Sequence, residues 1–271
     1  MPLMKWLFAL SLTSLLGACG GSSGFVPFIS AAKPEFLQYG RTATILLGGS
    51  HLRSFLVVES PGCANPVFSQ RSTPELLVLN CTVNVVGDLP LSVKDTEGKV
   101  VFATTLTVPK PQVALVTSMG SILFELDPAK APVSVNNFLG YVRQGFYTNT
   151  LFHRVIAGFV VQGGGYTTGL VKKSGLAAPI TLESNNGLSN LRGTLAMART
   201  NDLNSATSEF YVNLVDNVAL DTLNGGYAVF GAVVQGMGVV DTIASQTTGT
   251  MNGIGDVPLS EVTITSVTQV R

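Results

Sequence analysis

The sequence predicts a mainly β protein made of two consecutive β-rich units, the second of which also contains two helices. Residues 25–108 contain short β-branched, apolar runs separated by Gly- and Pro-containing turns, which is the pattern of an all-β sandwich. Residues 112–271 alternate as strands do, apart from two stretches with helical spacing. The chain of 271 residues is 46% hydrophobic and 12% charged, which indicates a well-buried globular protein with room for about two domains.

The N-terminal segment has the features of a targeting sequence and is set aside from the fold. Lys5 precedes the apolar run 6–18, which is too short for an ordinary membrane-spanning helix of about 20 residues. The run ends in L-G-A-C (16–19) and is followed by the flexible sequence G-G-S-S-G (20–24).

The L-G-A-C motif resembles the lipobox of bacterial lipoproteins. The resemblance implies that residues 1–18 are removed as a signal peptide and that Cys19 is lipidated. Residues 19–24 then tether the protein to a membrane through acyl chains, each buried CH₂ contributing about 0.8 kcal/mol. The implied location is the periplasm, and glycine at position 20 favours the outer membrane. The alternative is a plain secretory signal that leaves Cys19 free.

The first folded unit is predicted over residues 25–108, without helices. The sequence Y-G-R-T-A-T-I-L-L-G-G-S-H-L (39–52) resembles the start of immunoglobulin-like domains of the IPT/TIG type. This resemblance implies an immunoglobulin-like β-sandwich. The apolar runs expected as strands are 42–47, 55–58, 76–79, 82–86, 91–95 and 99–108.

Cys63 and Cys81 lie within this unit. In an oxidising compartment such a pair is expected to form a disulfide, which for this loop length stabilises a protein by roughly 3 kcal/mol. The alternative is two buried free thiols.

The segment V-P-K-P-Q (108–112) separates the two units and is predicted to be a hinge, because its prolines bar helix and restrict the residues before them. A hairpin is expected to turn at Met119–Ser121, and a second helix is expected over about 236–245. A first helix is expected after Pro132, where apolar residues recur at i, i+3, i+4 and i+7: Val135, Phe138, Leu139 and Val142.

Residues 152–163 read F-H-R-V-I-A-G-F-V-V-Q-G, which are two apolar, strand-like stretches joined by a turn. The folding back of these stretches is expected to bring Arg154, Phe159 and Gln162 together over one shallow apolar surface. No nucleophile or set of metal ligands accompanies them, so the sequence predicts conformational rather than covalent chemistry.

Strand alternation also predicts which way these side chains point. Phe152, Arg154 and Ile156 are expected on one face. His153 is expected to point into the interior, as a structural histidine with satisfied hydrogen bonds.

Composition excludes several other functions. Sixteen basic residues balance sixteen acidic ones, so there is no electrostatic footprint for nucleic acid. Two histidines and three cysteines do not make a convincing metal site. Nucleotide-binding glycine motifs are also missing from the sequence, and no cofactor is expected.

Several motifs in the second unit resemble those of the cyclophilins, a family of peptidyl-prolyl cis/trans isomerases, and most closely the periplasmic bacterial members. Besides 152–163, the motifs are A-P-V-S-V-N-N-F (131–138), G-F-Y (145–147), R-G-T-L-A-M-A-R (192–199), S-A-T-S-E-F-Y-V (205–212) and G-Y-A-V-F-G-A-V-V-Q-G-M (226–237). The resemblance covers residues 112–271. It implies a closed eight-stranded antiparallel β-barrel with a helix over each end, acting on Pro-containing polypeptides without a cofactor.

Isomerisation requires a group that prefers the twisted peptide bond. Twisting destroys the amide resonance, at a cost of about 18–20 kcal/mol, and returns a lone pair to the prolyl nitrogen. A fixed donor near that nitrogen binds the transition state better than the ground state, and arginine suits this role because it is always charged. Arg154 is the expected catalytic donor, which is also the position that the resemblance implies.

The resemblance assigns the other site residues. Phe159 and Gln162 complete the catalytic set, with Gln162 holding the substrate carbonyl or steadying Arg154. The apolar socket for proline comprises Phe159, Val160, Tyr211 and Leu220. Ala198 and the backbone of Arg199 are expected to bind the extended peptide as an added strand. Glu209 and Tyr227 complete the expected substrate-binding residues.

The chain departs from the family pattern at several of these positions. Tyr211 replaces phenylalanine and is expected to bring a hydroxyl to the pocket rim. Ala219 stands where eukaryotic members have tryptophan, which predicts poor binding of cyclosporin-type inhibitors. Glu209 replaces the usual glutamine. Its carboxylate is expected either to hold Arg154 in a bidentate pair or to compete with substrate, reducing activity modestly. Other departures are Ala157 for proline, Val160 for methionine and Tyr227 for histidine.

Two other functions fit the sequence. One is a non-catalytic module that binds Pro-containing segments, with residues 25–108 selecting clients. The other is a structural envelope lipoprotein whose barrel is a scaffold, since fold does not fix function. Retention of Arg154, Phe159 and Gln162 favours an isomerase that assists the folding of exported proteins.

Overall fold

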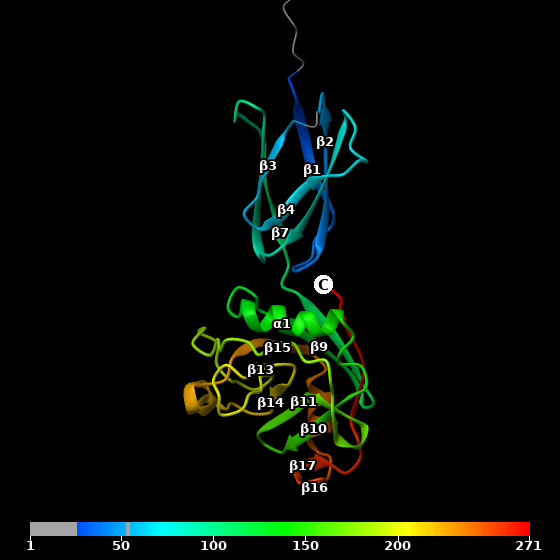
Figure 1. Cartoon of the computed structure of the whole chain (residues 1–271), viewed down its shortest axis with the longest axis vertical. Helices are drawn as coiled ribbons and strands as arrows, with labels where there is room; N and C mark the ends of the chain where they lie inside the picture. The colour runs from blue at the N-terminus through cyan, green and yellow to red at the C-terminus, as the bar shows by residue number, and fades with distance from the viewer. Residues whose placement is uncertain (1–25, 53–54) are drawn as a thin grey trace, which may run out of the picture.

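The computed structural model describes residues 26–52 and 55–271. The predicted signal segment and Cys19 lie outside the described residues. Within them, no helix is long and apolar enough to cross a membrane. The chain forms a β-sandwich followed by a closed β-barrel (Figure 1).

The sandwich consists of two antiparallel sheets whose apolar faces meet. One sheet has the strand order β1-β2-β5-β4 and the other β3-β6-β7. Ile45 and Leu79 of the first sheet and Leu91 and Val93 of the second belong to one buried cluster. The strands are β1 (Phe28–Phe36), β2 (Thr42–Ser50), β3 (Val57–Glu59), β4 (Cys63–Phe68), β5 (Leu76–Val83), β6 (Gly87–Lys94) and β7 (Val100–Val108).

The sandwich differs from the strand prediction at several points. Strand β6 begins at Gly87, four residues before the predicted run 91–95, and β3 is Val57–Glu59 rather than 55–58. The runs 76–79 and 82–86 were expected as separate strands, but β5 continues through both as far as Val83. Asn80 does not break the strand, because its Oδ1 accepts a cross-strand hydrogen bond of 3.0 Å from Thr44 Oγ1. Strands β1 and β4 were not predicted, since both are largely exposed and lack a long apolar run.

The predicted disulfide between Cys63 and Cys81 is confirmed. It joins β4 to β5, and both cysteines are buried. Reduction is expected to lower the free energy of unfolding of the sandwich by about 3 kcal/mol, because the cross-link restricts the unfolded chain. Denaturant unfolding with and without reductant measures this. An unchanged unfolding transition of the sandwich would contradict the expectation. The unfolding of the barrel, which contains no cysteine, is the internal control.

The barrel is closed by eight antiparallel strands in the order β10-β18-β8-β9-β15-β13-β14-β11, with β11 pairing back to β10. A short strand, β12, adds to β11 outside the ring. Strands β16 and β17 form a separate hairpin. The strands are β8 (Gln112–Thr117), β9 (Gly120–Leu126), β10 (Thr150–Ile156), β11 (Val160–Thr167), β12 (Val171–Lys172), β13 (Thr194–Met197), β14 (Phe210–Asn213), β15 (Val229–Gln235), β16 (Thr248–Met251), β17 (Ile254–Pro258) and β18 (Thr263–Gln269).

Two α-helices form where the apolar spacing predicts them, α1 (Pro132–Arg143) and α2 (Met237–Ala244). Proline stands in the first turn of α1, where its missing N–H costs nothing. The Glu183 carboxylate accepts hydrogen bonds from the backbone N–H of Val133 and from Ser134, so it caps this helix from a distant loop. Three short 3₁₀ segments are η1 (Thr168–Leu170), η2 (Val218–Asp221) and η3 (Leu223–Gly225).

The barrel core is centred on Phe138 of α1, which is fully buried. Its ring lies 5.4 Å from those of Phe210 and Phe230 and 5.1 Å from that of Tyr147, measured between centroids. Val240 and Ile243 of α2 belong to the same cluster. Helix α1 is therefore joined to the strands through one aromatic group.

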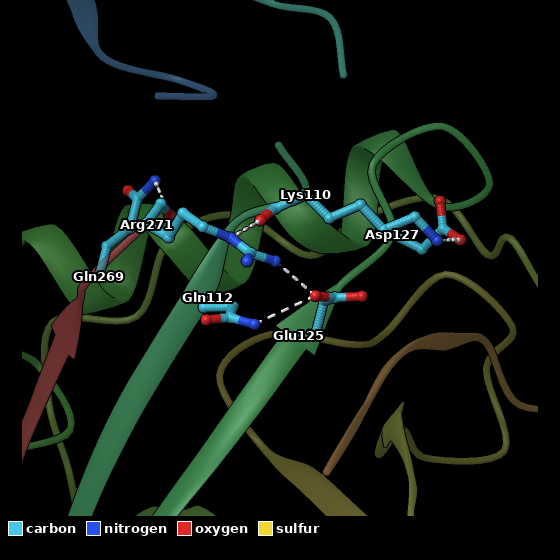
Figure 2. A network of polar contacts seen from close by, with 6 residues as sticks. All are labelled: Lys110, Gln112, Glu125, Asp127, Gln269 and Arg271. Atoms are coloured by element: carbon cyan, nitrogen blue, oxygen red, sulfur yellow. Dashed lines mark hydrogen bonds and ion pairs between the residues drawn. The ribbon is translucent and has the colours of Figure 1, made fainter. Parts of the chain in front are cut away.

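The linker between the two units is attached to the barrel at several points (Figure 2). Lys110 Nζ forms an ion pair with Asp127 at 2.7 Å, and Arg271 Nε donates to the Lys110 carbonyl at 3.0 Å. The backbone N–H of Leu126 donates to the Pro111 carbonyl. Arg271 and Gln112 also bind the Glu125 carboxylate. These contacts hold the segment that was expected to be a hinge.

The sandwich also contacts the barrel directly. Tyr39, in the turn between β1 and β2, is 4% exposed and belongs to the barrel's core cluster. Its hydroxyl donates to Asn136 Oδ1 of α1 at 3.1 Å, and its carbonyl accepts from Gln269 Nε2 at 3.0 Å. The C-terminus lies at this junction (Figure 1). The sandwich therefore contacts the barrel at α1 and at the C-terminal end of the chain.

Candidate active site

The site is built on the antiparallel pair β10–β11, where a local irregularity changes the expected alternation. Phe152 pairs with Gly163 and Arg154 with the adjacent Gln162, so His153 is an extra residue in β10. Such a bulge turns the following side chains to the other face. Phe152 is consequently in the barrel core, whereas Arg154 is partly exposed. The prediction that these two share a face was wrong for this reason.

A cavity of about 210 Å³ lies against this pair of strands and gathers nine of the ten predicted catalytic and substrate-binding residues. Glu209 is the exception and lines a second cavity of about 230 Å³, which shares three residues with the first. The first cavity is lined by Arg154, Phe159, Val160, Gln162, Ala198, Arg199, Tyr211, Leu220, Leu223 and Tyr227. Leu223 was not predicted; it begins the separate 3₁₀ segment η3, three residues after Leu220.

Arg154 is held from two sides. Its Nη1 donates to Gln162 Oε1 at 3.3 Å, and its Nε lies 3.9 Å from the Asp256 carboxylate. Asp256 comes from the β16–β17 hairpin and was not predicted, since no sequence pattern links it to β10. The expected bidentate pair with Glu209 is not the arrangement observed, because Glu209 contacts Gln162 instead. The guanidinium therefore remains partly exposed, and it can present N–H donors to the cavity.

The floor of the cavity is apolar. Val160, Tyr211 and Leu220 are buried in one cluster, and Phe159 and Tyr227 pack against it. The Tyr211 hydroxyl was expected at the pocket rim, but it points inward and donates to Asn190 Oδ1 at 2.8 Å. Burial, reinforced by the nearby Tyr227 and Asp221, raises the pKa of Tyr211 far above its usual value, so the phenol stays neutral.

A buried amide positions this tyrosine. Asn190 is fully buried, and its Nδ2 and backbone N–H both donate to Asp221 Oδ1 at 2.8 Å. Burial raises the pKa of Asp221, but the hydrogen bonds from Ser189 and Asn190 lower it more, for a net decrease. The network fixes the amide so that its oxygen faces Tyr211.

The Arg199 side chain is engaged within the protein. Its guanidinium donates to the carbonyls of Thr200, Asn224 and Gly226 and lies 4.5 Å from the centre of the Tyr227 ring. These contacts fix the η3 loop at the rim of the cavity. Ala198 donates its backbone N–H to the Glu209 carbonyl, so only its carbonyl is available for the predicted pairing with a peptide.

His153 is 3% exposed, with its Nε2 3.3 Å from Glu209 Oε2. It therefore lies beside the second cavity, which Glu209 lines, rather than in the barrel core where it was predicted. It was expected to be fully satisfied, but its Nδ1 is buried without a hydrogen-bond partner in the described part of the chain.

Two other observations bear on the choice of site. A larger cavity of about 400 Å³ lies between β9, β15 and the loop around Leu188, and it contains none of the predicted residues. We take the smaller cavity as the site because a charged donor meets an apolar floor there. Within residues 26–52 and 55–271, no group of three or more His, Cys, Asp and Glu side chains could hold a metal ion.

Fold and site together place a partly exposed guanidinium beside a cavity with an apolar floor on a closed antiparallel barrel. A family model described as cyclophilin-type peptidyl-prolyl cis-trans isomerase/CLD matches residues 112–269, more than half of the chain. The chain belongs to this family of enzymes.

Individual relatives support this assignment. Peptidyl-prolyl cis-trans isomerase cyp18 of Streptomyces antibioticus is 52% identical over 159 residues, covering 57% of this chain and 95% of that protein. Peptidyl-prolyl cis-trans isomerase B of Escherichia coli K12 is 51% identical over 157 residues, covering 56% and 95%. A crystal structure of a Cryptosporidium parvum cyclophilin-type isomerase in the presence of the dipeptide Ala-Pro has a TM-score of 0.50 and 26% identity, covering 59% and 99%.

Proposed function

We propose that this protein isomerises X–Pro bonds in exported polypeptides, with Arg154 as the catalytic donor. The observation that carries the proposal is the partly exposed Arg154 guanidinium beside a small cavity with an apolar floor. The membership of the barrel in an isomerase family supports the same reaction.

The reaction needs no covalent step. When the X–Pro bond twists, conjugation is lost and the prolyl nitrogen becomes pyramidal, with its lone pair restored. An N–H of Arg154 then donates to that nitrogen, an interaction that the planar ground state cannot offer. Because this donor favours only the twisted form, it lowers the barrier to rotation about the X–Pro bond rather than merely binding substrate. Gln162 and Asp256 keep the guanidinium in place before substrate arrives.

The apolar floor serves as the pivot. The proline ring sits against Phe159, Val160 and Leu220, which exclude water from one side of the bond. The residue before proline remains outside the cavity and rotates. The volume of about 210 Å³ suits one proline ring and its neighbouring atoms rather than a large ligand.

We further propose that the enzyme works at the cell envelope. The sequence motif ending at Cys19 supports a lipid anchor in the periplasm, in the outer membrane in particular. The sandwich, proposed to be a domain of the IPT/TIG type, stands between that anchor and the barrel, so it acts as a spacer and a surface for clients. Mass spectrometry of the purified mature protein tests the anchor, since an unmodified Cys19 would exclude it.

The isomerase proposal is tested by two-dimensional NMR exchange on an Ala-Pro peptide with soluble residues 20–271. Cross-peaks between the cis and trans forms are expected within seconds, whereas the uncatalysed exchange takes tens of seconds or longer. Shifted peptide resonances without faster exchange would instead indicate the binding module. If the protein causes neither faster exchange nor shifted resonances, the scaffold function is indicated.

Weak binding of cyclosporin-type inhibitors is a separate expected result. Ala219 is exposed in η2, next to the cavity residue Leu220, and provides no indole for the inhibitor to contact. Ala219→Trp is expected to strengthen binding about tenfold or more, because a buried indole is among the largest contributors to an interface. Isothermal titration of both forms measures this. Tight binding by the unmodified chain would contradict the expectation.

A further inference from the structure

Glu209 lies immediately before β14 and does not contact the catalytic guanidinium. Its Oε2 accepts a hydrogen bond from Gln162 Nε2 at 2.9 Å and lies 3.3 Å from His153 Nε2. The Glu209 side chain is only 25% exposed. One carboxylate oxygen is thus directed at the amide that in turn contacts Arg154.

The chemistry of the carboxylate decides which way that amide points. A glutamine amide has a donor end and an acceptor end, whereas an ionised carboxylate only accepts. Beside Glu209, the Gln162 NH₂ group must face the carboxylate. Its Oε1 is then turned toward Arg154, where it accepts from Nη1 at 3.3 Å. A reversed amide would place its NH₂ against the guanidinium, so that two donors faced each other.

We propose that Glu209 is a positioning residue that fixes the orientation of the Gln162 amide and, through it, the place of Arg154. This inference rests on the proposed isomerase function. This positioning role replaces both roles expected from the sequence. Glu209 neither pairs with Arg154 nor occupies the guanidinium N–H groups that face substrate.

The surroundings of Glu209 keep it ionised. Burial raises its pKa, but the hydrogen bond and charge of His153, the Gln162 amide and the charge of Lys172 lower it more, for a net decrease. The carboxylate is therefore ionised, and acts as an acceptor, at any pH at or above the ordinary pKa of glutamate. That role is lost only as the pH falls through the lowered pKa.

The backbone beside Glu209 leaves room for this arrangement. A Cβ built on Gly165 would come within 2.5 Å of Glu209 Oε1. Any side chain at this position of β11 would push the carboxylate away from Gln162. Gly165 thus leaves the space that the Glu209 carboxylate occupies.

Three substitutions at Glu209 distinguish the effect of losing the hydrogen-bond acceptor from the effect of losing the negative charge. Glu209→Gln keeps an acceptor and is expected to retain kcat/KM within about threefold. Glu209→Met removes the acceptor and is expected to lower it about three- to tenfold. Glu209→Lys offers only donors, reverses the amide, and is expected to lower it tenfold or more, mainly in kcat because the proline cavity remains intact. The same NMR exchange assay measures all three.

Thr207→Lys is the control for the introduced ammonium group, because it puts the same lysine on the wall of the second cavity while the carboxylate that contacts Gln162 stays in place. It is expected to stay within about twofold of the unmodified enzyme. An equal loss in Thr207→Lys and Glu209→Lys would overturn the proposal, since charge alone would explain both. A loss in Glu209→Gln as large as that in Glu209→Lys would also overturn it.

A spectroscopic measurement keeps this inference separate from the isomerase proposal. Nitrogen-15 resonances of the Gln162 side chain and of Arg154 Nε report the hydrogen bonds whether or not the protein is active. They are expected to move little in Glu209→Gln and strongly in Glu209→Lys. Unchanged Gln162 resonances in Glu209→Lys would contradict the orientation role, whereas absence of exchange by the unmodified protein would contradict only the proposed function.

Discussion

Arg154→Ala is expected to lower kcat/KM about 10²- to 10³-fold, the loss seen when a donor aimed at developing charge is removed. The other donors at the cavity are engaged elsewhere, since Arg199 donates to backbone carbonyls and the Gln162 amide donates to Glu209, so neither is placed to replace the donor to the prolyl nitrogen. Peptide affinity is expected to change little, because the apolar floor formed by Phe159, Val160 and Leu220 remains. Two-dimensional NMR exchange gives the rate, and titration of peptide shifts gives the affinity.

Arg71→Ala is a suitable control for this experiment. Arg71 is exposed in the turn between β4 and β5 of the sandwich, so its loss removes the same charge without touching the barrel. Activity within about twofold of the unmodified protein is expected. If Arg154→Ala behaved like Arg71→Ala, Arg154 would not be the catalytic donor.

Phe138→Ala is expected to destabilise the barrel by about 3–5 kcal/mol, because it removes the buried ring at the centre of the aromatic group and leaves a cavity. The barrel strands cannot close this space, since the rings of Phe210, Phe230 and Tyr147 are held by their own strands and loops. For a unit of this size the barrel's melting temperature should fall by about 10 °C. Calorimetry measures the transition.

Phe36→Ala is the corresponding control at an exposed position. Phe36 lies at the end of β1 and is 44% exposed, so its removal leaves no internal cavity. A change within about 0.5 kcal/mol is expected. A melting temperature of Phe138→Ala close to that of Phe36→Ala would show that the barrel core relaxes around the missing ring.

The parts of the fold that depend on local pattern could be predicted from the sequence. Helix α1 follows from apolar spacing after Pro132, and the strands of the barrel follow from alternation together with the family motifs. The bulge at His153 could not be predicted, because an extra residue in a strand leaves no mark in an apolar run. Its effect is large, since it separates Phe152 from Arg154.

The same limit applies to the site. The residues lining the cavity are close to one another in a few motifs, and nine of the expected residues were found there. Asp256 and Asn190 come from segments without such motifs and act through tertiary contacts. The direction of the Tyr211 hydroxyl also depended on Asn190. Sequence therefore predicted which residues meet, but not which hydrogen bonds orient them.

The attachment of the linker has a consequence for the clients that the enzyme can serve. Because Lys110 and Pro111 are bonded to the barrel, the short connection between the two units supplies no slack. The distance between the sandwich and the proline cavity is therefore fixed. Under the proposed role of the sandwich as a surface for clients, a client bound there must span that separation with its own unfolded chain to reach the cavity. The proposed role would therefore favour prolines at a particular distance along the client from the bound segment.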